Sequence, residues 1–222
     1  MTGASGAVAL MFAPSPFAID DPEVVADLLA RAPLATLIVA TPEGLEAAHL
    51  PLLYDAASGV LSGHLARANP LARMDGVQAL AVFSGAQAYV SPGFYPSKRA
   101  HGRVVPTWNY EAVHVHGGLE RFDEPGALRA VVAALSDRFE AERPQPWSVD
   151  DAPEPYLAGM LRAIVGVRLH AQRIEGVRKL SQNRDAADRA GVREGLSGSG
   201  RPGDRVTAAL METLEQGHGE HD

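Results

Sequence analysis

The chain alternates short apolar runs with turn-forming residues, a pattern typical of antiparallel β-structure. The runs that have strand length lie at residues 35–40, 45–55, 60–65, 79–83, 86–91, 113–120 and 164–170. Pro51 interrupts the second run, which fits an edge strand because proline lacks the N–H that a central strand donates. Ser84-Gly85 predicts a turn between the fourth and fifth strands. Residues 92–110 are rich in Pro, Gly and aromatic side chains and predict a long loop.

Helical spacing of apolar residues indicates four helices. The first lies between Asp21 and Pro33, and the second lies between Asp123 and Pro144. A short third helix is expected at 156–162, and Val206, Leu210 and Leu214 form the stripe of a terminal helix. Residues 67–74 predict a short helix or turn, and the Gly/Ser-rich residues 195–203 predict a linker.

Because the strands follow one another directly, parallel β-α-β units are not expected. The pattern instead predicts a mainly β, α+β protein with an antiparallel, barrel-like core and helical additions. We expect a disordered N-terminal extension at 1–10, one domain at 11–185 with a helical insert at 123–162, and a linker plus C-terminal helix at 186–222.

Composition narrows the chemistry of the chain. It contains no cysteine, which excludes disulfides, thiolate zinc sites, iron–sulfur clusters and cysteine nucleophiles. The formal net charge of −7 gives only weak support to direct DNA binding, because DNA-binding proteins present a basic face. No apolar run reaches the roughly 20 residues of a membrane-spanning helix, so we expect no membrane partner and a cytoplasmic protein.

Three groups of polar residues are candidates for binding. Trp108, Asn109 and Tyr110 could form the wall of a flat ligand site, or could pin their loop to the core. The segment Ser181-Gln182-Asn183-Arg184 could hydrogen-bond a polar ligand, or could begin a helix that Ser181 caps. Arg67, beside Asn69-Pro70 at a strand end, could hold a phosphate or could be a solvated surface residue.

His114 and His116 are two residues apart on a predicted strand, so their side chains point to the same face. Two imidazoles can ligate a metal if a third ligand joins them, and His49, His64 or His101 could supply it. They could equally line a polar cavity or a subunit interface, and we do not predict a metal site.

Seven motifs occur in order along the chain: Met11-Phe12-Ala13-Pro14, His49-Leu50-Pro51-Leu52, Gly63-His64 with Ala66 and Asn69-Pro70, Ala88-Tyr89-Val90-Ser91 with Tyr95, Val105-Pro106-Thr107-Trp108-Asn109-Tyr110 with Ala112-Val113-His114-Val115, Ile164-Val165-Gly166 and Lys179-Leu180-Ser181-Gln182-Asn183-Arg184. With these motifs the chain resembles the PaiB-type family of FMN-binding negative transcriptional regulators. The motifs extend over about residues 11–185.

The resemblance implies a split β-barrel of the pyridoxamine-phosphate-oxidase type and a homodimer with FMN sites at the subunit interface. Arg67, with Asn69 nearby, would hold the FMN phosphate, and the strand with His49, Leu50 and Pro51 would run beside the isoalloxazine. The segment with Lys179, Gln182, Asn183 and Arg184 would return to the same site. Trp108, Asn109, His114 and His116 would lie where barrel, long loop and partner subunit meet.

Three functions are compatible with such a protein. The preferred hypothesis is a dimeric, flavin-binding regulatory protein, which acts as a transcriptional repressor or as a partner of one, and an enzymatic activity stays open. The alternatives are a small flavin-dependent oxidoreductase that uses NAD(P)H and a haem-binding or haem-degrading split barrel in which histidines act as axial ligands.

Overall fold

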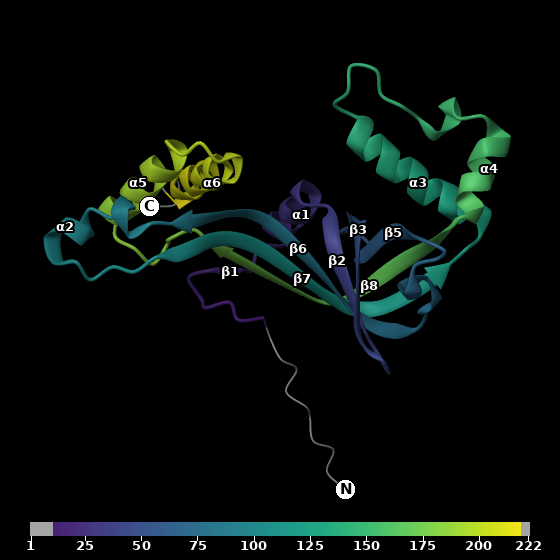
Figure 1. The fold of residues 1–222 in the computed structure, drawn as a ribbon, viewed down its shortest axis with the longest axis horizontal. Coiled ribbons are helices and arrows are strands. Elements are labelled where there is room, and N and C mark those ends of the chain that lie inside the picture. The colour runs from purple at the N-terminus through teal and green to yellow at the C-terminus, as the bar shows by residue number, and fades with distance from the viewer. Residues whose placement is uncertain (1–10, 219–222) are drawn as a thin grey trace, which may run out of the picture. The chain divides into compact units, whose positions relative to one another are not determined.

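The computed structural model describes residues 11–218, and the predicted extension at 1–10 lies outside this range. The described residues divide into two compact units, which are described one at a time. Unit 1 holds residues 11–21, 84–112 and 175–218, and unit 2 holds residues 22–83 and 113–174. The three longest strands, labelled in Figure 1, are β6 (Val77–Val90), β7 (Thr107–Phe122) and β8 (Ile164–Lys179), and each contributes residues to both units.

Unit 2 is built on a sheet whose two ends are joined by the chain itself. The strand order is β3-β2-β6-β7-β8-β5-β4, in which β2 spans Leu34–Thr41, β3 Gly44–Pro51, β4 Leu53–Asp55 and β5 Val60–Ala66. Only Leu52 separates β3 from β4, although these strands stand at opposite ends of the order. One residue spans at most about 3.6 Å, so the two ends of this open sheet come together at Leu52 and the sheet curls into a split barrel.

Close contact at this junction requires a glycine. The carbonyl oxygen of Pro51 lies 2.5 Å from the position that a Cβ on Gly63 would occupy. Pro51 ends β3, a strand at the end of the order, so the prediction of an edge position for this proline is confirmed.

The barrel interior is filled by alternate apolar side chains of its strands. The fully buried ones, from β2, β3, β5, β6, β7 and β8 in turn, include Leu37, Val39, Leu50, Leu61, Phe83, Val113, Val115, Val165 and Leu169. Strict alternation along β2 and β5 confirms the strands predicted at 35–40 and 60–65. Burial of this kind, at about 1.5–3 kcal/mol per large side chain, is the main stabilising contribution to the barrel.

Helices of unit 2 confirm three of the predicted helical segments. α1 (Pro22–Arg31) buries Val25, Leu28 and Leu29. α3 (Pro125–Glu140) and α4 (Glu154–Arg162) share a second apolar cluster, and they lie next to each other in Figure 1. The members of this cluster that are buried are Leu128, Val149, Leu157 and Leu161.

Unit 1 combines the remaining residues of β6, β7 and β8 with a two-residue strand and three helices. The small strand is β1 (Ala18–Ile19), which pairs antiparallel with β8 at Val177 and Gly176. The helices are α2 (Ser97–His101), α5 (Ala186–Ser197) and α6 (Pro202–His218). α5 and α6 pack together over the buried residues of this unit, which are Ala88, Val90, Tyr95, Leu180, Val192, Leu196, Ala208 and Met211.

Two predictions about strands are wrong. Residues 77–90 form one strand, β6, and do not turn at Ser84-Gly85. The strand changes its buried face at this pair instead. Phe83 and Ala88 are five residues apart and would point to opposite faces of a regular strand, yet both are buried. Residues 107–110 belong to β7 and not to a long loop, because neighbouring strands β6 and β8 pair with β7 and extend it backwards from residue 113.

The C-terminal part also departs from the prediction. β8 continues to Lys179, nine residues beyond the expected end at 170, and Ser181 does not cap a helix. A helix does follow this segment, as one of the two interpretations expected, but α5 begins at Ala186 and its N-cap is Asp185. Helix α6 contains the predicted terminal stripe, and residues 198–201 alone connect α5 to α6. Among the described helices, none combines the length and apolar character needed to cross a membrane.

Candidate functional site

The predicted site residues fall into two sets, one in each unit. Unit 1 holds the tryptophan and the polar C-terminal motif: Trp108, Asn109, Lys179, Gln182, Asn183 and Arg184. Unit 2 holds the histidines and the predicted phosphate ligand: His49, Leu50, Pro51, Arg67, Asn69, His114 and His116.

In unit 1, a tight turn follows β8 and carries the polar motif. Ser181 has a φ of 66°, a left-handed conformation that costs a non-glycine residue free energy. The Gln182 side chain closes this turn on both sides. Its Oε1 accepts from the Leu180 N–H at 2.6 Å, and its Nε2 donates to the Arg178 carbonyl at 2.5 Å. The amide of Gln182 is therefore used within its own turn.

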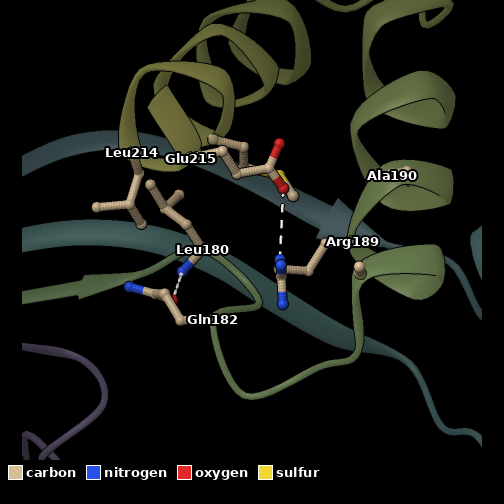
Figure 2. A pocket seen from close by; sticks show the side chains of 8 residues that line it. Leu180, Gln182, Arg189, Ala190, Leu214 and Glu215 are labelled. Carbon is tan, nitrogen blue, oxygen red and sulfur yellow. Dashed lines mark hydrogen bonds and ion pairs between the residues drawn. The ribbon is translucent and has the colours of Figure 1, made fainter. Parts of the chain in front are cut away.

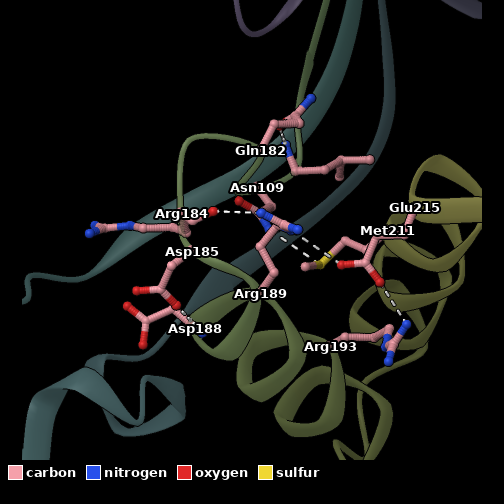
Figure 3. A network of polar contacts seen from close by, with 10 residues as sticks. Asn109, Gln182, Arg184, Asp185, Asp188, Arg189, Arg193, Met211 and Glu215 are labelled. Atoms are coloured by element: carbon pink, nitrogen blue, oxygen red, sulfur yellow. Dashed lines mark hydrogen bonds and ion pairs between the residues drawn. The ribbon is translucent and has the colours of Figure 1, made fainter. Parts of the chain in front are cut away.

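Asn109 joins the turn to the helices (Figure 3). It is fully buried, its Oδ1 accepts from the Ser181 hydroxyl at 3.1 Å, and its Nδ2 donates to Met211 Sδ at 3.6 Å. Two residues further along β7, the buried Glu111 carboxylate is held by Arg178 Nε at 2.7 Å. These buried polar groups form hydrogen bonds and an ion pair with one another, so Asn109 has a structural role in unit 1.

Lys179 fastens the beginning of β7. Its ammonium donates to Thr107 Oγ1 at 2.5 Å and to the Trp108 carbonyl at 2.8 Å. Burial and, to a lesser extent, the nearby charge of Arg184 lower the pKa of Lys179. The guanidinium of Arg184 lies over the Tyr95 ring, 4.9 Å from its centroid. Asn183 is exposed.

The opposite face of this sheet carries an exposed aromatic pair. Trp108 and Tyr89 are 51% and 41% exposed, and their rings meet edge to face with centroids 6.1 Å apart. The segment 91–107 between β6 and β7 contains three exposed cations, Lys98, Arg99 and Arg103, and no acidic residue. An open aromatic surface close in sequence to uncompensated positive charge fits a planar ligand that carries an anionic group. FMN has this chemistry.

In unit 2, Arg67 is engaged with the backbone. Its Nε and Nη2 donate to the carbonyls of Arg162 and Ile164, both at 2.9 Å, and its Nη1 lies 3.7 Å from Asp123. These contacts tie the end of β5 to the beginning of β8. Asn69 accepts from the Leu71 N–H at 2.9 Å and caps a short 3-10 helix. The phosphate-binding role of Arg67 stays a prediction.

His49, Leu50 and Pro51 occupy three different environments at the end of β3. His49 is exposed and its Nδ1 lies 3.0 Å from Thr36 Oγ1. Leu50 is buried in the barrel, and Pro51 is half-buried at the junction with β5. Of the three, His49 offers the most accessible side chain to a ligand.

The histidines of β7 lie on one half-buried face of the barrel. His114 and His116 are edge to face with ring centroids 6.4 Å apart, which confirms that they share a side. His64 on β5 is also half-buried, and its buried Nδ1 has no hydrogen-bond partner within residues 11–218. Burial lowers the pKa of His64. No group of three potential metal ligands occurs in the described part of the chain.

Sequence reasoning missed an ionic cluster on β7 and β8. Glu120 accepts from Arg168 Nη1 at 2.8 Å and lies 2.6 Å from His170 Nε2, while Arg168 also stacks on the Phe122 ring at 4.0 Å. Hydrogen bonding to His170, and then to Arg168, lowers the pKa of Glu120. Residues two apart on a strand point to the same face of the sheet. The sequence signal for such a cluster is therefore the spacing of Glu120 and Phe122 on one strand and of Arg168 and His170 on the neighbouring one.

Sequence comparison identifies the family. Residues 11–173 match the family described as "Putative FMN-binding domain", and FMN is the cofactor that this membership assigns. A Bacillus subtilis protein named "Protease synthase and sporulation protein PAI 2" is 30% identical over 207 residues, 91% of this chain and 97% of the relative. An uncharacterized Aspergillus fumigatus protein is 33% identical over 196 residues, 73% of this chain and 74% of the relative. The chain therefore belongs to the PaiB-type, FMN-binding-domain family.

Solved structures support the fold. The FAD and heme binding protein from Mycobacterium smegmatis has a TM-score of 0.55 and 18% identity, with 78% of each chain covered. The flavocytochrome Anf3 from Azotobacter vinelandii has a TM-score of 0.54 and 15% identity, covering 78% of this chain and 74% of that one. The prediction of an antiparallel split barrel of the FMN-binding type is confirmed.

Proposed function

We propose that this protein is a homodimeric transcriptional regulator that binds FMN on the exposed aromatic face of unit 1. The observation that carries the proposal is the exposed Trp108–Tyr89 pair, close in sequence to a basic segment without acids. Membership in the FMN-binding-domain family supports the choice of ligand. When bound, FMN supplies a planar, redox-active ring system.

Each part of FMN has a complementary group in this proposal. The indole of Trp108 stacks on the ring system, and Lys179 keeps the strand beneath it in place through the Trp108 carbonyl. Arg99 and Arg103 are free to approach the phosphate from the exposed segment 91–107. His49, Arg67, His114 and His116 remain candidates for contacts to the cofactor in the dimer.

A homodimer would cover this aromatic face. Exposed Tyr89 and Trp108 together form an apolar surface of the kind that marks binding sites. A second copy of the chain would shield the bound ring from water. We expect light scattering to give twice the 23.5 kDa mass of the chain, and a monomer at micromolar concentration would contradict the dimer.

Regulation through a protein partner fits the charge better than direct DNA binding. The net charge of −7 repels phosphates, and a DNA-binding face would need a large local excess of cations. The Bacillus subtilis relative is named a protease synthase and sporulation protein, and the regulatory role proposed here rests on the resemblance to the PaiB-type family. Gel-shift assays with promoter DNA at physiological salt are expected to show no shift, and a specific shift would contradict indirect action.

Two variants locate the flavin. Trp108→Leu should weaken FMN binding by up to about tenfold, because an aromatic stack contributes about 0.5–1.5 kcal/mol beyond area burial. Trp147→Phe is the matched control, since Trp147 has a similar exposure of 44% and belongs to unit 2. Equal FMN affinity of Trp108→Leu and Trp147→Phe would reject the aromatic face as the flavin site.

The phosphate contact is tested separately. Arg99→Gln together with Arg103→Gln should weaken FMN by about tenfold or more and leave riboflavin, which lacks the phosphate, unaffected. Arg67→Ala with the same selective loss of FMN would assign the phosphate to Arg67 instead. A loss of stability without that selectivity would assign Arg67 to its contacts with Arg162 and Ile164.

A further inference from the structure

Unit 1 contains a pocket on the helix-covered side of its sheet. The pocket has a volume of about 390 Å³ and lies where the turn after β8 meets α5 and α6 (Figure 2). This volume falls in the range of small-molecule sites, about 300–1,000 Å³. The residues that line it are Leu180, Gln182, Ala186, Arg189, Ala190, Met211, Leu214 and Glu215.

One part of the pocket wall is apolar. Leu180 and Met211 belong to the buried cluster of unit 1, and Leu214 packs against that cluster from α6. Ala186 and Ala190 are four residues apart on α5, so they face the same side and leave the space open. This part of the wall suits an aliphatic chain.

The other part of the wall carries excess positive charge. Arg189 Nη1 donates to the Arg184 carbonyl at 2.6 Å, and Arg189 Nε reaches Glu215 Oε1 only at 3.4 Å, beyond the usual range of a strong hydrogen bond. Arg193 holds the other oxygen of Glu215 at 2.7 Å. Two guanidinium groups thus share one carboxylate, and Arg189 Nη2 has no hydrogen-bond partner within residues 11–218.

Both polar atoms of the Gln182 amide are engaged in the turn after β8. The cationic group in the pocket wall is the guanidinium of Arg189. We propose that this pocket binds a small amphipathic carboxylate, with its aliphatic chain against Leu180, Met211 and Leu214 and its carboxylate on Arg189.

The proposed pocket is separate from the proposed flavin site. Asn109 points to the helix side and donates to Met211, which lines the pocket, whereas its neighbour Trp108 points to the opposite, exposed face. The pocket and the flavin surface therefore lie on different sides of the sheet of unit 1. The inference does not rest on FMN binding and can hold if the proposed function fails.

Octanoate and octan-1-ol test the proposal, because they share an aliphatic chain and differ in the charged end. Ligand-observed NMR titrations of the full-length protein should show saturable binding of octanoate and weaker binding of octan-1-ol. Arg189→Gln should weaken octanoate by about tenfold or more and leave octan-1-ol unchanged. Arg193→Gln is a comparison variant, since Arg193 contacts the same glutamate but does not line the pocket. It should weaken octanoate less than Arg189→Gln does, because it removes charge beside Glu215 but keeps the guanidinium in the pocket wall, and it should leave octan-1-ol unchanged.

A second variant fills the pocket without touching the core. Ala190 is exposed, so Ala190→Trp should leave the melting temperature unchanged and abolish binding of both ligands. Three results would overturn the proposal: no saturable binding of octanoate, wild-type affinity in Arg189→Gln, or retained binding in folded Ala190→Trp. FMN affinity of Ala190→Trp should equal that of the wild-type protein, which keeps this test distinct from the test of the flavin site.

Discussion

Replacement of Arg178 by methionine should strongly destabilise unit 1. The Arg178 guanidinium is an ion-pair partner of Glu111, whose side chain is completely buried, with Nε 2.7 Å from Glu111 Oε1. Arg178→Met removes this positive charge from beside the buried carboxylate. Loss of one partner from a buried pair costs about 3–5 kcal/mol, and we expect about 3 kcal/mol because the Arg178 side chain is itself 18% exposed.

The matched control is Arg193→Met. Arg193 contacts Glu215 at the same distance of 2.7 Å, but both side chains are about one third exposed. An exposed pair of this kind contributes about 0–1 kcal/mol. The two variants make the same chemical change in the same unit, so burial of the carboxylate is the main difference between them.

Urea unfolding measures both variants. In a Trp147→Phe background, the remaining tryptophan, Trp108, reports on unit 1. A loss of about 3 kcal/mol lowers the urea midpoint by about 1–2 M at the slopes usual for proteins of this size. Equal midpoints for Arg178→Met and Arg193→Met would refute the argument that burial makes the Glu111 pair important.

Two other predictions concern unit 2. Gly166→Ala should destabilise the barrel by about 1–3 kcal/mol in urea unfolding, because the new Cβ would overlap the Phe122 ring. Gly118→Ala is the control and should be tolerated, because its Cβ would meet only one side-chain atom, at 4.0 Å. The pKa of Glu120 in the folded protein lies below the ordinary 4.5, so Glu120 stabilises the fold above that pH, and this contribution is lost as the pH falls through the folded pKa. Glu120→Gln should therefore show a smaller loss of stability between pH 5 and pH 3, and an unchanged pH profile would contradict the role of the contact with His170.

Local sequence was sufficient for the elements whose burial follows a simple period. The apolar alternation of β2 and β5 and the stripe of α1 are visible in the chain, and the structure agrees with them. Pro51 correctly indicated an edge of the sheet, because proline has no backbone N–H to donate to a second neighbouring strand.

Long-range pairing decided the elements that local sequence missed. Trp108 and Asn109 look like loop residues after a Pro- and Gly-rich segment, yet sheet pairing with neighbouring strands makes them part of β7. The pair Ser84-Gly85 is typical of a turn, but both residues lie within β6. Because Gly85 has no side chain, Glu111 can pack closely against it: the Cβ of Glu111 lies 3.0 Å from the position that a Cβ on Gly85 would occupy. Neither outcome can be derived from the residues of one segment alone.

The candidate site shows the same limit. The residue types of Asn109, Gln182 and Arg67 suggested hydrogen bonding. Asn109 and Arg67 bond to distant segments, whereas Gln182 bonds within its own turn. Exposure distinguished the neighbours Trp108 and Asn109, which sequence reasoning had grouped together. Period-two alternation would have separated them if the strand had been recognised.

Titration of the purified protein with FMN at neutral pH tests the central claim most directly. The account predicts saturable quenching of flavin fluorescence, with an affinity that falls when Trp108 is replaced by leucine and stays constant when Trp147 is replaced by phenylalanine. Unquenched flavin fluorescence at protein concentrations well above micromolar would contradict the assignment of FMN as the ligand of this chain.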